Sequence, residues 1–259
     1  MRLFLLPDSF NGSDELVLTG KEYNYIVKVL RLKENASLTG RDKNGNAWNL
    51  TILSVSKNSC RLSAVRDSFA KDTTDTLPQD RPTHNMVLYH CLPKGRKFDE
   101  IIKRATEIGV RTIVPVKSKN CIASIEGKEE ARLERYEAMV KEAVQQSGSM
   151  VPTSVEKTID IKDIASDFKT RCSEFKEEGL GLILHQCKIR ENQKDLLSTV
   201  KGFDGCVAIV VGPEGGFTDK ECDSLLAEGF NAILLKSNIL RCETAAIYAV
   251  AAVQTILES

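Results

Sequence analysis

The sequence lacks a net charge, a long apolar run and closely spaced cysteines, and each absence excludes a class of protein. Its 259 residues carry 36 lysines and arginines against 36 aspartates and glutamates. This balance excludes a polycation of the histone type but is compatible with a local basic face. No apolar run approaches the roughly 20 residues of a membrane helix, and the apolar patch at the start is too short for a secretory signal. We therefore expect a cytoplasmic protein.

The eight cysteines follow no metal-binding pattern. They are Cys60, Cys91, Cys121, Cys172, Cys187, Cys206, Cys222 and Cys242. No two of them stand two to four residues apart, which is the spacing that presents two thiolates to one zinc ion. We expect small buried thiols, with neither a structural metal nor a disulfide framework.

The zero net charge conceals a gradient along the chain. Residues 1–70 hold ten basic and seven acidic residues, residues 71–150 hold fourteen and twelve, and residues 151–259 hold twelve and seventeen. The net charges are therefore +3, +2 and −5. The length predicts about two domains. A polar stretch with two prolines at 67–83 favours a linker at 71–83, between domains at 1–70 and 84–259.

The first domain has the pattern of a small β-barrel. Three apolar segments, at 36–39, 47–55 and 60–65, predict strands, and the polar residues 42–46 predict a hairpin turn between the first two. Apolar residues at helical spacing predict one short helix at 21–32.

The second domain alternates strands and helices. Strands are predicted at 86–91, 112–116, 181–185, 207–211 and 232–235, and helices at 98–108, 128–146, 161–175, 195–200, 219–228 and 243–257. Nearly continuous apolar strands are typical of a parallel sheet covered on both faces. The fold class is therefore α/β, and ligands of such sheets bind beyond the carboxyl ends of the strands.

A glycine-rich loop follows the strand at 207–211. It reads VGPEGGFT at 211–218, and it matches neither the Walker A nor the dinucleotide-binding pattern. Glycines let the backbone bend sharply and let a ligand approach it closely, so we expect a ligand loop. A tight turn between strand and helix is the alternative. Thr218 or Asp219 is expected to cap the next helix, with Glu221 as the partner in a capping box.

Two further strand ends carry polar residues. The segment 234–246 reads LLKSNILRCETAA and places Arg241 and Glu243 at the start of an alanine-rich helix. They are either functional or a surface pair. His185 follows another strand and is either a base or a structural residue.

The two loops together resemble the RsmE family, the bacterial 16S ribosomal RNA uridine-N3 methyltransferases of the SPOUT superfamily. The resemblance rests on VGPEGGF at 211–217 followed by ILRCETA at 239–245. Shorter matches extend it over essentially the whole chain: Phe4, 29–31, 92–97, 107–110, 142–148 and Pro152. Tyr25 stands where members commonly have histidine, and Asn120 and Ser149 stand where they commonly have arginine.

This resemblance implies a fold and a cofactor. It implies an N-terminal PUA-like β-barrel that binds RNA and a C-terminal SPOUT-type α/β domain with a trefoil knot. It also implies S-adenosylmethionine as the cofactor, a homodimer, and 16S rRNA of the small ribosomal subunit as the partner, with no membrane and no metal. S-adenosylmethionine has no phosphate, so the missing phosphate-binding motifs do not count against it.

The resemblance and the chemistry of methyl transfer assign candidate residues. The cofactor candidates are Leu184, His185, Gly212, Pro213, Glu214, Gly215, Gly216, Leu235, Ser237, Asn238, Ile239, Leu240, Thr244 and Ala245. Arg241 is the candidate cation that stabilises the uridine anion, with Glu243 as its orienter or a polar contact. The RNA-binding candidates are Arg2, Lys28, Arg31, Lys33, Lys94, Arg96 and Lys97, each with a solvated surface charge as the alternative.

Two other functions stay open from the sequence alone. One is a different SPOUT methyltransferase that acts on a tRNA or on a ribose 2′-hydroxyl. The other is a non-catalytic RNA-binding assembly factor that has kept the fold.

Overall fold

The chain divides into two compact units. The computed structural model describes residues 3–44, 46–67, 84–121, 129–149, 151–184, 193–235 and 237–259. One unit contains Met1–Arg81 and Val144–Met150, and the other contains Pro82–Ala143 and Val151–Ser259. The expected linker at 71–83 lies outside the described residues, as do Arg2 and His185.

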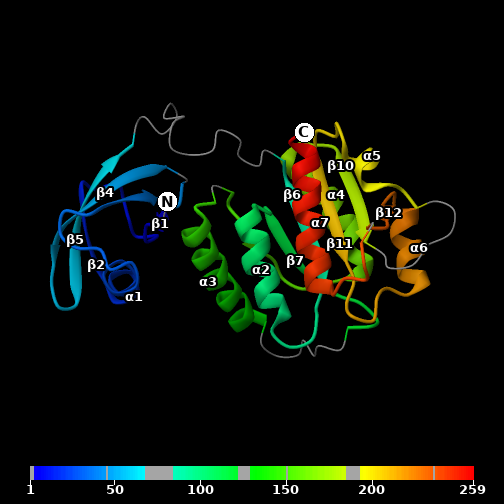
Figure 1. The fold of residues 1–259 in the computed structure, drawn as a ribbon, viewed down its shortest axis with the longest axis horizontal. Helices are drawn as coiled ribbons and strands as arrows, with labels where there is room; N and C mark the ends of the chain where they lie inside the picture. Colours follow the sequence, from blue (N-terminus) through cyan, green and yellow to red (C-terminus); the bar gives the residue numbers. More distant parts are fainter. Residues whose placement is uncertain are drawn as a thin grey trace. The chain divides into compact units, whose positions relative to one another are not determined.

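The first unit contains a curled five-stranded sheet (Figure 1). Its strands are β1 (Leu3–Leu5), β2 (Glu15–Thr19), β3 (Ser37–Arg41), β4 (Ala47–Val55) and β5 (Ser59–Arg66), in the order β1-β3-β4-β5-β2. The predicted hairpin is confirmed, because β3 and β4 pair antiparallel. β1 and β2 were not predicted from the pattern, since one is three residues long and the other is mostly exposed.

The predicted helix at 21–32 is two helical segments. α1 (Gly20–Tyr23) continues into a π-helix, η1 (Asn24–Val29). The helix ends before Arg31, whose φ of 56° is left-handed. One face packs against the sheet in a core that contains Phe4, Leu6, Leu18, Tyr23, Ile26, Trp48, Leu50, Ile52, Cys60, Leu62 and Ala64. Tyr23 and Trp48 are therefore core residues of this unit.

The second unit is built on a parallel sheet, as predicted. Its strands are β6 (Met86–Cys91), β7 (Thr112–Lys117), β8 (Ser154–Val155), β9 (Ile159–Asp160), β10 (Gly179–Leu184), β11 (Cys206–Val211) and β12 (Asn231–Ile233). The order is β12-β10-β11-β6-β7-β8, and β9 also pairs with β7. Every residue of β6 and β11 is buried, which explains their uninterrupted apolar runs.

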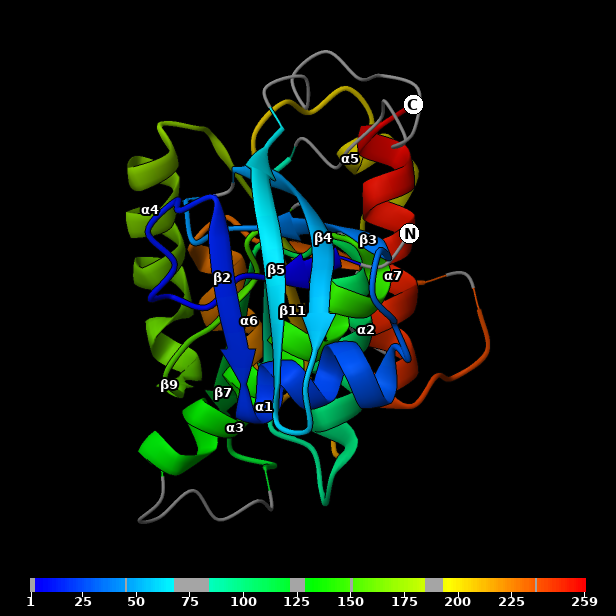
Figure 2. The same cartoon turned by 90° about the vertical axis from the view of Figure 1, so that its left-hand side faces the viewer.

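Helices cover both faces of this sheet (Figures 1 and 2). They are α2 (Lys97–Ile108), α3 (Glu129–Ser147), η2 (Ile161–Asp163), α4 (Ile164–Phe175), α5 (Leu196–Val200), α6 (Asp219–Ala227) and α7 (Cys242–Leu257). α2 and α7 pack together on one face, and α4 and α6 bury Phe168 and Leu225 against the other. No helix in the described ranges has the length and apolarity to cross a membrane.

The strand order places the ends of three strands together. β10 lies between β11 and β12, and all three run parallel. The chain reaches β12 at the side of β10 away from β11, and α7 then returns to contact β11 and β6. The loops that follow β11 and β12 therefore leave the same edge of the sheet, where ligands of α/β proteins bind.

Candidate functional site

The glycine-rich loop that follows β11 is the first wall of the site. Its backbone turns where the N–H of Gly216 donates to the Pro213 carbonyl at 2.9 Å, and Gly216 has a left-handed φ of 67°. The loop ends in the predicted capping box, in which Thr218 and Glu221 exchange hydrogen bonds at the start of α6. At Gly212, an added Cβ would stand 3.2 Å from the ring of Phe217. The loop therefore depends on glycine for both conformation and space.

The loop that follows β12 is the second wall. It turns where the N–H of Ser237 donates to the Leu235 carbonyl at 2.8 Å, and it leads to Arg241, the N-cap residue of α7. The hydroxyl of Ser237 donates to the Asn238 carbonyl at 3.0 Å. These two hydrogen bonds hold the turn in a defined conformation.

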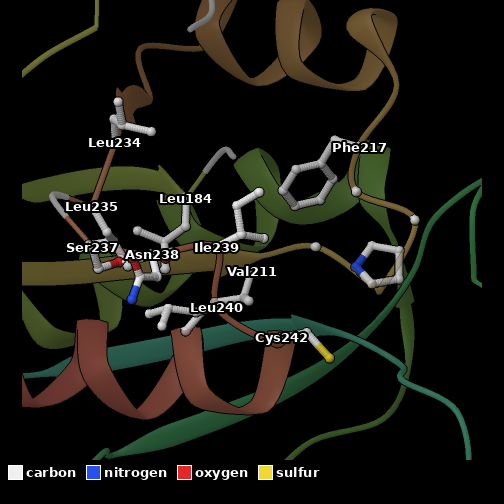
Figure 3. Close-up of a pocket in the computed structure, with 15 residues that line it drawn as sticks. Leu184, Val211, Phe217, Leu234, Leu235, Ser237, Asn238, Ile239, Leu240 and Cys242 are labelled. Carbon is white, nitrogen blue, oxygen red and sulfur yellow. Dashed lines mark hydrogen bonds between the residues drawn. The ribbon is translucent and has the colours of Figure 1, made fainter. Parts of the chain in front are cut away.

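The two loops enclose a hollow of about 210 Å³. Figure 3 shows apolar side chains of both loops, among them Phe217 and Ile239, directed into the space between them. The lining residues are Leu184, Val211, Gly212, Pro213, Gly215, Gly216, Phe217, Leu234, Leu235, Ser237, Asn238, Ile239, Leu240, Cys242 and Ala245. The hollow therefore brings together most of the residues that the sequence assigned to the cofactor.

The differences from the prediction are few. Glu214 and Thr244 do not line the hollow, and Val211, Phe217, Leu234 and Cys242 line it without having been predicted. Val211, Phe217 and Cys242 are also buried, so the apolar pattern of the sequence does not distinguish them from core residues.

The lining fits an uncharged aromatic group joined to a polar chain. None of the described lining residues is charged. Ser237 contributes a hydroxyl group and Asn238 contributes a side-chain amide. The absence of a Cβ at Gly212 keeps the ring of Phe217 close to the main chain. Adenine needs such an apolar slot with main-chain hydrogen bonds, and S-adenosylmethionine carries no phosphate. The residues present therefore fit this cofactor.

A cluster of three charged residues, Lys97, Glu214 and Glu243, connects the glycine-rich loop to the start of α7. Lys97, at the start of α2, places its Nζ 2.8 Å from Glu214 Oε1 and 3.7 Å from Glu243 Oε2. The backbone N–H of Lys94 also donates to Glu214, at 3.2 Å. Lys97 was predicted to contact RNA, and the structure gives it two carboxylate partners. Glu243, predicted to orient Arg241, has its Oε2 3.7 Å from the Nζ of Lys97.

These contacts explain the ionisation of the cluster. Burial raises the pKa of Glu214, but hydrogen bonds from Lys97 and from backbone N–H groups outweigh it, so the pKa falls below the ordinary value. Burial likewise raises the pKa of Glu243. Its own backbone N–H, the Cys242 thiol, Lys97 and Arg241 outweigh burial, so this pKa also falls below the ordinary value. Both groups are carboxylates at neutral pH.

Arg241 stands at the start of α7 with an exposed side chain. It lies between two residues that line the hollow, Leu240 and Cys242, but it does not line the hollow itself. Its side chain is therefore accessible from solvent, next in sequence to two residues that line the hollow.

His90 is a polar residue of this region that the sequence analysis missed. It is fully buried at the end of β6, with Nδ1 2.7 Å from the Cys91 carbonyl and Nε2 3.4 Å from the Cys242 carbonyl. Burial lowers the pKa of His90, which favours the neutral ring. A neutral ring has a single N–H to donate, and the shorter distance assigns it to the Cys91 carbonyl, so Nε2 only lies against the first residue of α7. The available signal was a histidine inside the otherwise mostly apolar strand 86–91.

The remaining RNA-binding candidates are exposed. Lys28, Arg31 and Lys33 follow one another around the end of η1, and Lys94 and Arg96 lie between β6 and α2. Lys28 also stands 6.0 Å from the centre of the Tyr23 ring. These side chains are free of the core, as phosphate contacts require.

Comparisons with known proteins define the class. A family described as "RNA methyltransferase domain" matches residues 79–254, and one described as "RNA methyltransferase PUA domain" matches residues 18–65. The first match covers the parallel sheet and both loops of the hollow. The fold and site are therefore those of an RNA methyltransferase.

Relatives narrow the class further. A ribosomal RNA small subunit methyltransferase E from Aquifex aeolicus is 31% identical over 180 residues, which are 68% of this chain and 71% of that protein. The protein of that name from Synechocystis is 27% identical over 100% of this chain and 78% of its own length. A crystal structure of the enzyme from Neisseria gonorrhoeae bound to S-adenosyl methionine matches 98% of this chain and 97% of that one, with 27% identity and a TM-score of 0.80. The chain belongs to the ribosomal RNA small subunit methyltransferase E family.

Membership confirms the fold class that the resemblance implied. The second unit is the SPOUT-type α/β domain, and the first contains the PUA-like domain.

Proposed function

We propose that the protein transfers a methyl group from S-adenosylmethionine to N3 of a specific uridine in 16S rRNA of the small ribosomal subunit. The observation that carries this proposal is the apolar hollow between the loops that follow β11 and β12. The relatives are named as methyltransferases of small-subunit ribosomal RNA, and the matched structure from Neisseria gonorrhoeae holds S-adenosyl methionine. All three observations support the same reaction.

The two loops hold the cofactor in this proposal. The glycine-rich loop offers main-chain groups at 212–216, and the second loop offers them at 235–240. Ala245, Glu214, Thr244 and His185 are proposed as further contacts, the last of these on the resemblance alone. The cofactor supplies a methyl group on a positively charged sulfur. The chain's own contribution is to hold the acceptor in line with that group, and such positioning accelerates transfer strongly.

The acceptor nitrogen needs activation, because N3 of uridine carries a proton. Its loss leaves negative charge on O2 and O4 of the base, which a nearby cation stabilises. We assign this role to Arg241, whose side chain is exposed and whose two neighbours in the sequence line the hollow. Glu243 is proposed to orient Arg241 or to contact the base, and Lys97 holds its carboxylate at 3.7 Å.

The RNA is proposed to bind both domains. Exposed Lys28, Arg31 and Lys33 offer phosphate contacts on the first unit, and Lys94, Arg96 and Lys97 offer them on the second; Arg2 completes the set. The domains are proposed to span 1–70 and 84–259, with a linker at 71–83. Binding through these cations should weaken steeply as salt rises, because each phosphate contact releases counterions.

We also propose that the enzyme is a homodimer in the cytoplasm, where ribosomal RNA is found. Two apolar side chains near the site support a covering partner. Ile239 lines the hollow and is 84% exposed, and Tyr248 on α7 is 47% exposed. A second copy that packs on α7 would remove both from water.

The test is the methylation state of 16S rRNA. A strain that lacks the gene should lose 3-methyluridine from 16S rRNA, as measured by mass spectrometry of nucleosides and of RNA fragments. The wild-type gene should restore it, and a gene that carries Arg241→Ala should not. Persistence of 3-methyluridine in the deletion strain would overturn the assignment. Loss of a methyl group from tRNA or from a ribose would replace it by another reaction.

A further inference from the structure

A turn that follows β7, two strands away from β11 in the sheet, contacts the glycine-rich loop from outside the hollow. This turn, 118–121, follows β7. The side-chain amide of Asn120 donates to the carbonyls of Gly215, at 3.2 Å, and of Gly216, at 3.0 Å. One primary amide has two N–H groups, so a single side chain can bind two successive carbonyls of the loop.

The turn that carries Asn120 is itself held in place. The N–H of Cys121 donates to the Ser118 carbonyl at 3.1 Å. The N–H of Lys119 donates to Glu221 Oε1 at 2.8 Å, and Glu221 is the capping-box residue of α6. The position of Asn120 is thus set from β7 and from α6 before any ligand arrives.

The contact is close as well as bonded. A Cβ added to Gly215 would stand 3.2 Å from the Cβ of Asn120, which is tighter than an ordinary van der Waals contact. The amide therefore approaches the loop backbone at a distance that the glycine makes available.

These bonds set the direction of two peptide groups. In a planar trans peptide the carbonyl oxygen and the following N–H point to opposite sides. Asn120 draws the carbonyls of Gly215 and Gly216 toward itself, so the N–H groups of Gly216 and Phe217 point away from it. The first of these donates to the Pro213 carbonyl, and all of these residues except Asn120 line the hollow.

We propose that Asn120 is a positioning residue for S-adenosylmethionine, which fixes the peptide groups of the glycine-rich loop in the orientation that binds the cofactor. The inference rests on the proposed use of this cofactor. Asn120 acts through the loop, and we assign it no contact with the methyl group.

Binding of S-adenosylmethionine to the full-length protein, measured by calorimetry, tests the proposal. Asn120→Leu keeps the size of the side chain and removes both donors. We expect the Kd to rise about 10-fold, with kcat at saturating cofactor nearly unchanged. The matched control is Asn85→Leu, because Asn85 also donates a side-chain amide bond, to Glu177 at 2.7 Å, but precedes β6 and does not line the hollow. This control should bind the cofactor like the wild type.

A second variant keeps the test valid if Asn120→Leu fails to fold. Asn120→Asp has no donor when ionised, and one O–H donor when protonated. The two loop carbonyls should raise the pKa of the new carboxyl above its usual value of about 3.9. The ratio of its Kd to that of the wild type should therefore fall as the pH drops from about 8 to about 5, an effect that a merely structural role would not produce.

Three results would overturn the inference. Wild-type affinity in both Asn120 variants would show that the loop needs no support from Asn120. An equal loss of affinity in Asn85→Leu would show a general effect on the fold. A wild-type protein without affinity for S-adenosylmethionine would remove the proposed function together with this inference.

Discussion

The left-handed turn at Gly216 gives a quantitative test of the site. Gly216 has a φ of 67°, and no atom lies within 4 Å of an added Cβ. Gly216→Ala therefore adds backbone strain without a steric clash. An alanine in this conformation costs roughly 1–2 kcal/mol. That cost is shared between the stability of the protein and the binding of the cofactor.

The division of the cost depends on the loop. If the loop keeps its shape without ligand, the full cost lowers the free energy of unfolding, and the melting temperature falls by about 2–4 °C per kcal/mol for a unit of this size. If the loop relaxes, the cofactor must restore its shape, and the Kd rises by up to about 5–30-fold. The two losses should together amount to roughly 1–2 kcal/mol.

Gly229→Ala is the matched control. Gly229 has a φ of 91°, also with no atom within 4 Å of an added Cβ, but it lies in the turn after α6 and does not line the hollow. Its cost should appear in the melting temperature alone. Calorimetry with S-adenosylmethionine and thermal unfolding measure both quantities. If Gly216→Ala changed neither stability nor affinity, or if Gly229→Ala weakened binding equally, the reasoning would be refuted.

Three further predictions concern charged and ionisable groups. Arg241→Ala should abolish methyl transfer and keep cofactor binding, as followed by radiolabel transfer and calorimetry; near-normal turnover would remove Arg241 from the mechanism. The lowered pKa of Glu214 means that its ion pair stabilises the protein above the ordinary carboxyl pKa and is lost as the pH falls through the lowered value. Lys97→Met should shift this loss to higher pH in melting curves while Lys97→Arg should not, and identical curves for all three proteins would contradict the proposed ion pair. The pKa of Cys121 is lowered to about 6, mainly by a hydrogen bond from Cys91, against the effect of burial and with help from Ser118. Alkylation of Cys121, followed by peptide mapping, should therefore have a midpoint near that pH, and Ser118→Ala should raise it; a midpoint at the ordinary thiol value in the wild type would contradict the assignment.

Local elements of the second unit were predictable because their signals are local. The strands β6 and β11 are continuous apolar runs between polar residues, and they begin and end within one residue of the predicted limits. The helix predicted from Asp195 begins at Leu196, because the Asp195 carboxylate caps it by accepting from the N–H of Ser198. The two loops of the hollow followed from the same pattern, since glycines and polar residues interrupt it at strand ends.

The partners of charged residues were not predictable in the same way. Lys97, Glu214 and Glu243 lie far apart in the sequence, and the fold brings them together from the start of α2, the loop after β11 and the start of α7. The periodicity of each segment contains no information about contacts between side chains of distant segments. His90 has a sequence signal, a histidine inside a buried strand, but its proximity to the Cys242 carbonyl on a distant helix has none.

The short strand β12 has a consequence for how the protein responds to its ligand. Among the described residues, β12 pairs with β10 along three residues and with Lys194 through one bridge. So short a strand opens at a lower free energy than the inner strands, yet it carries one wall of the hollow. A ligand that contacts both walls ties this weakly held strand to β11 at the centre of the sheet. The concentration of the cofactor thereby governs how often this margin of the sheet opens, and amide hydrogen exchange at 231–233 would report the occupancy of the site.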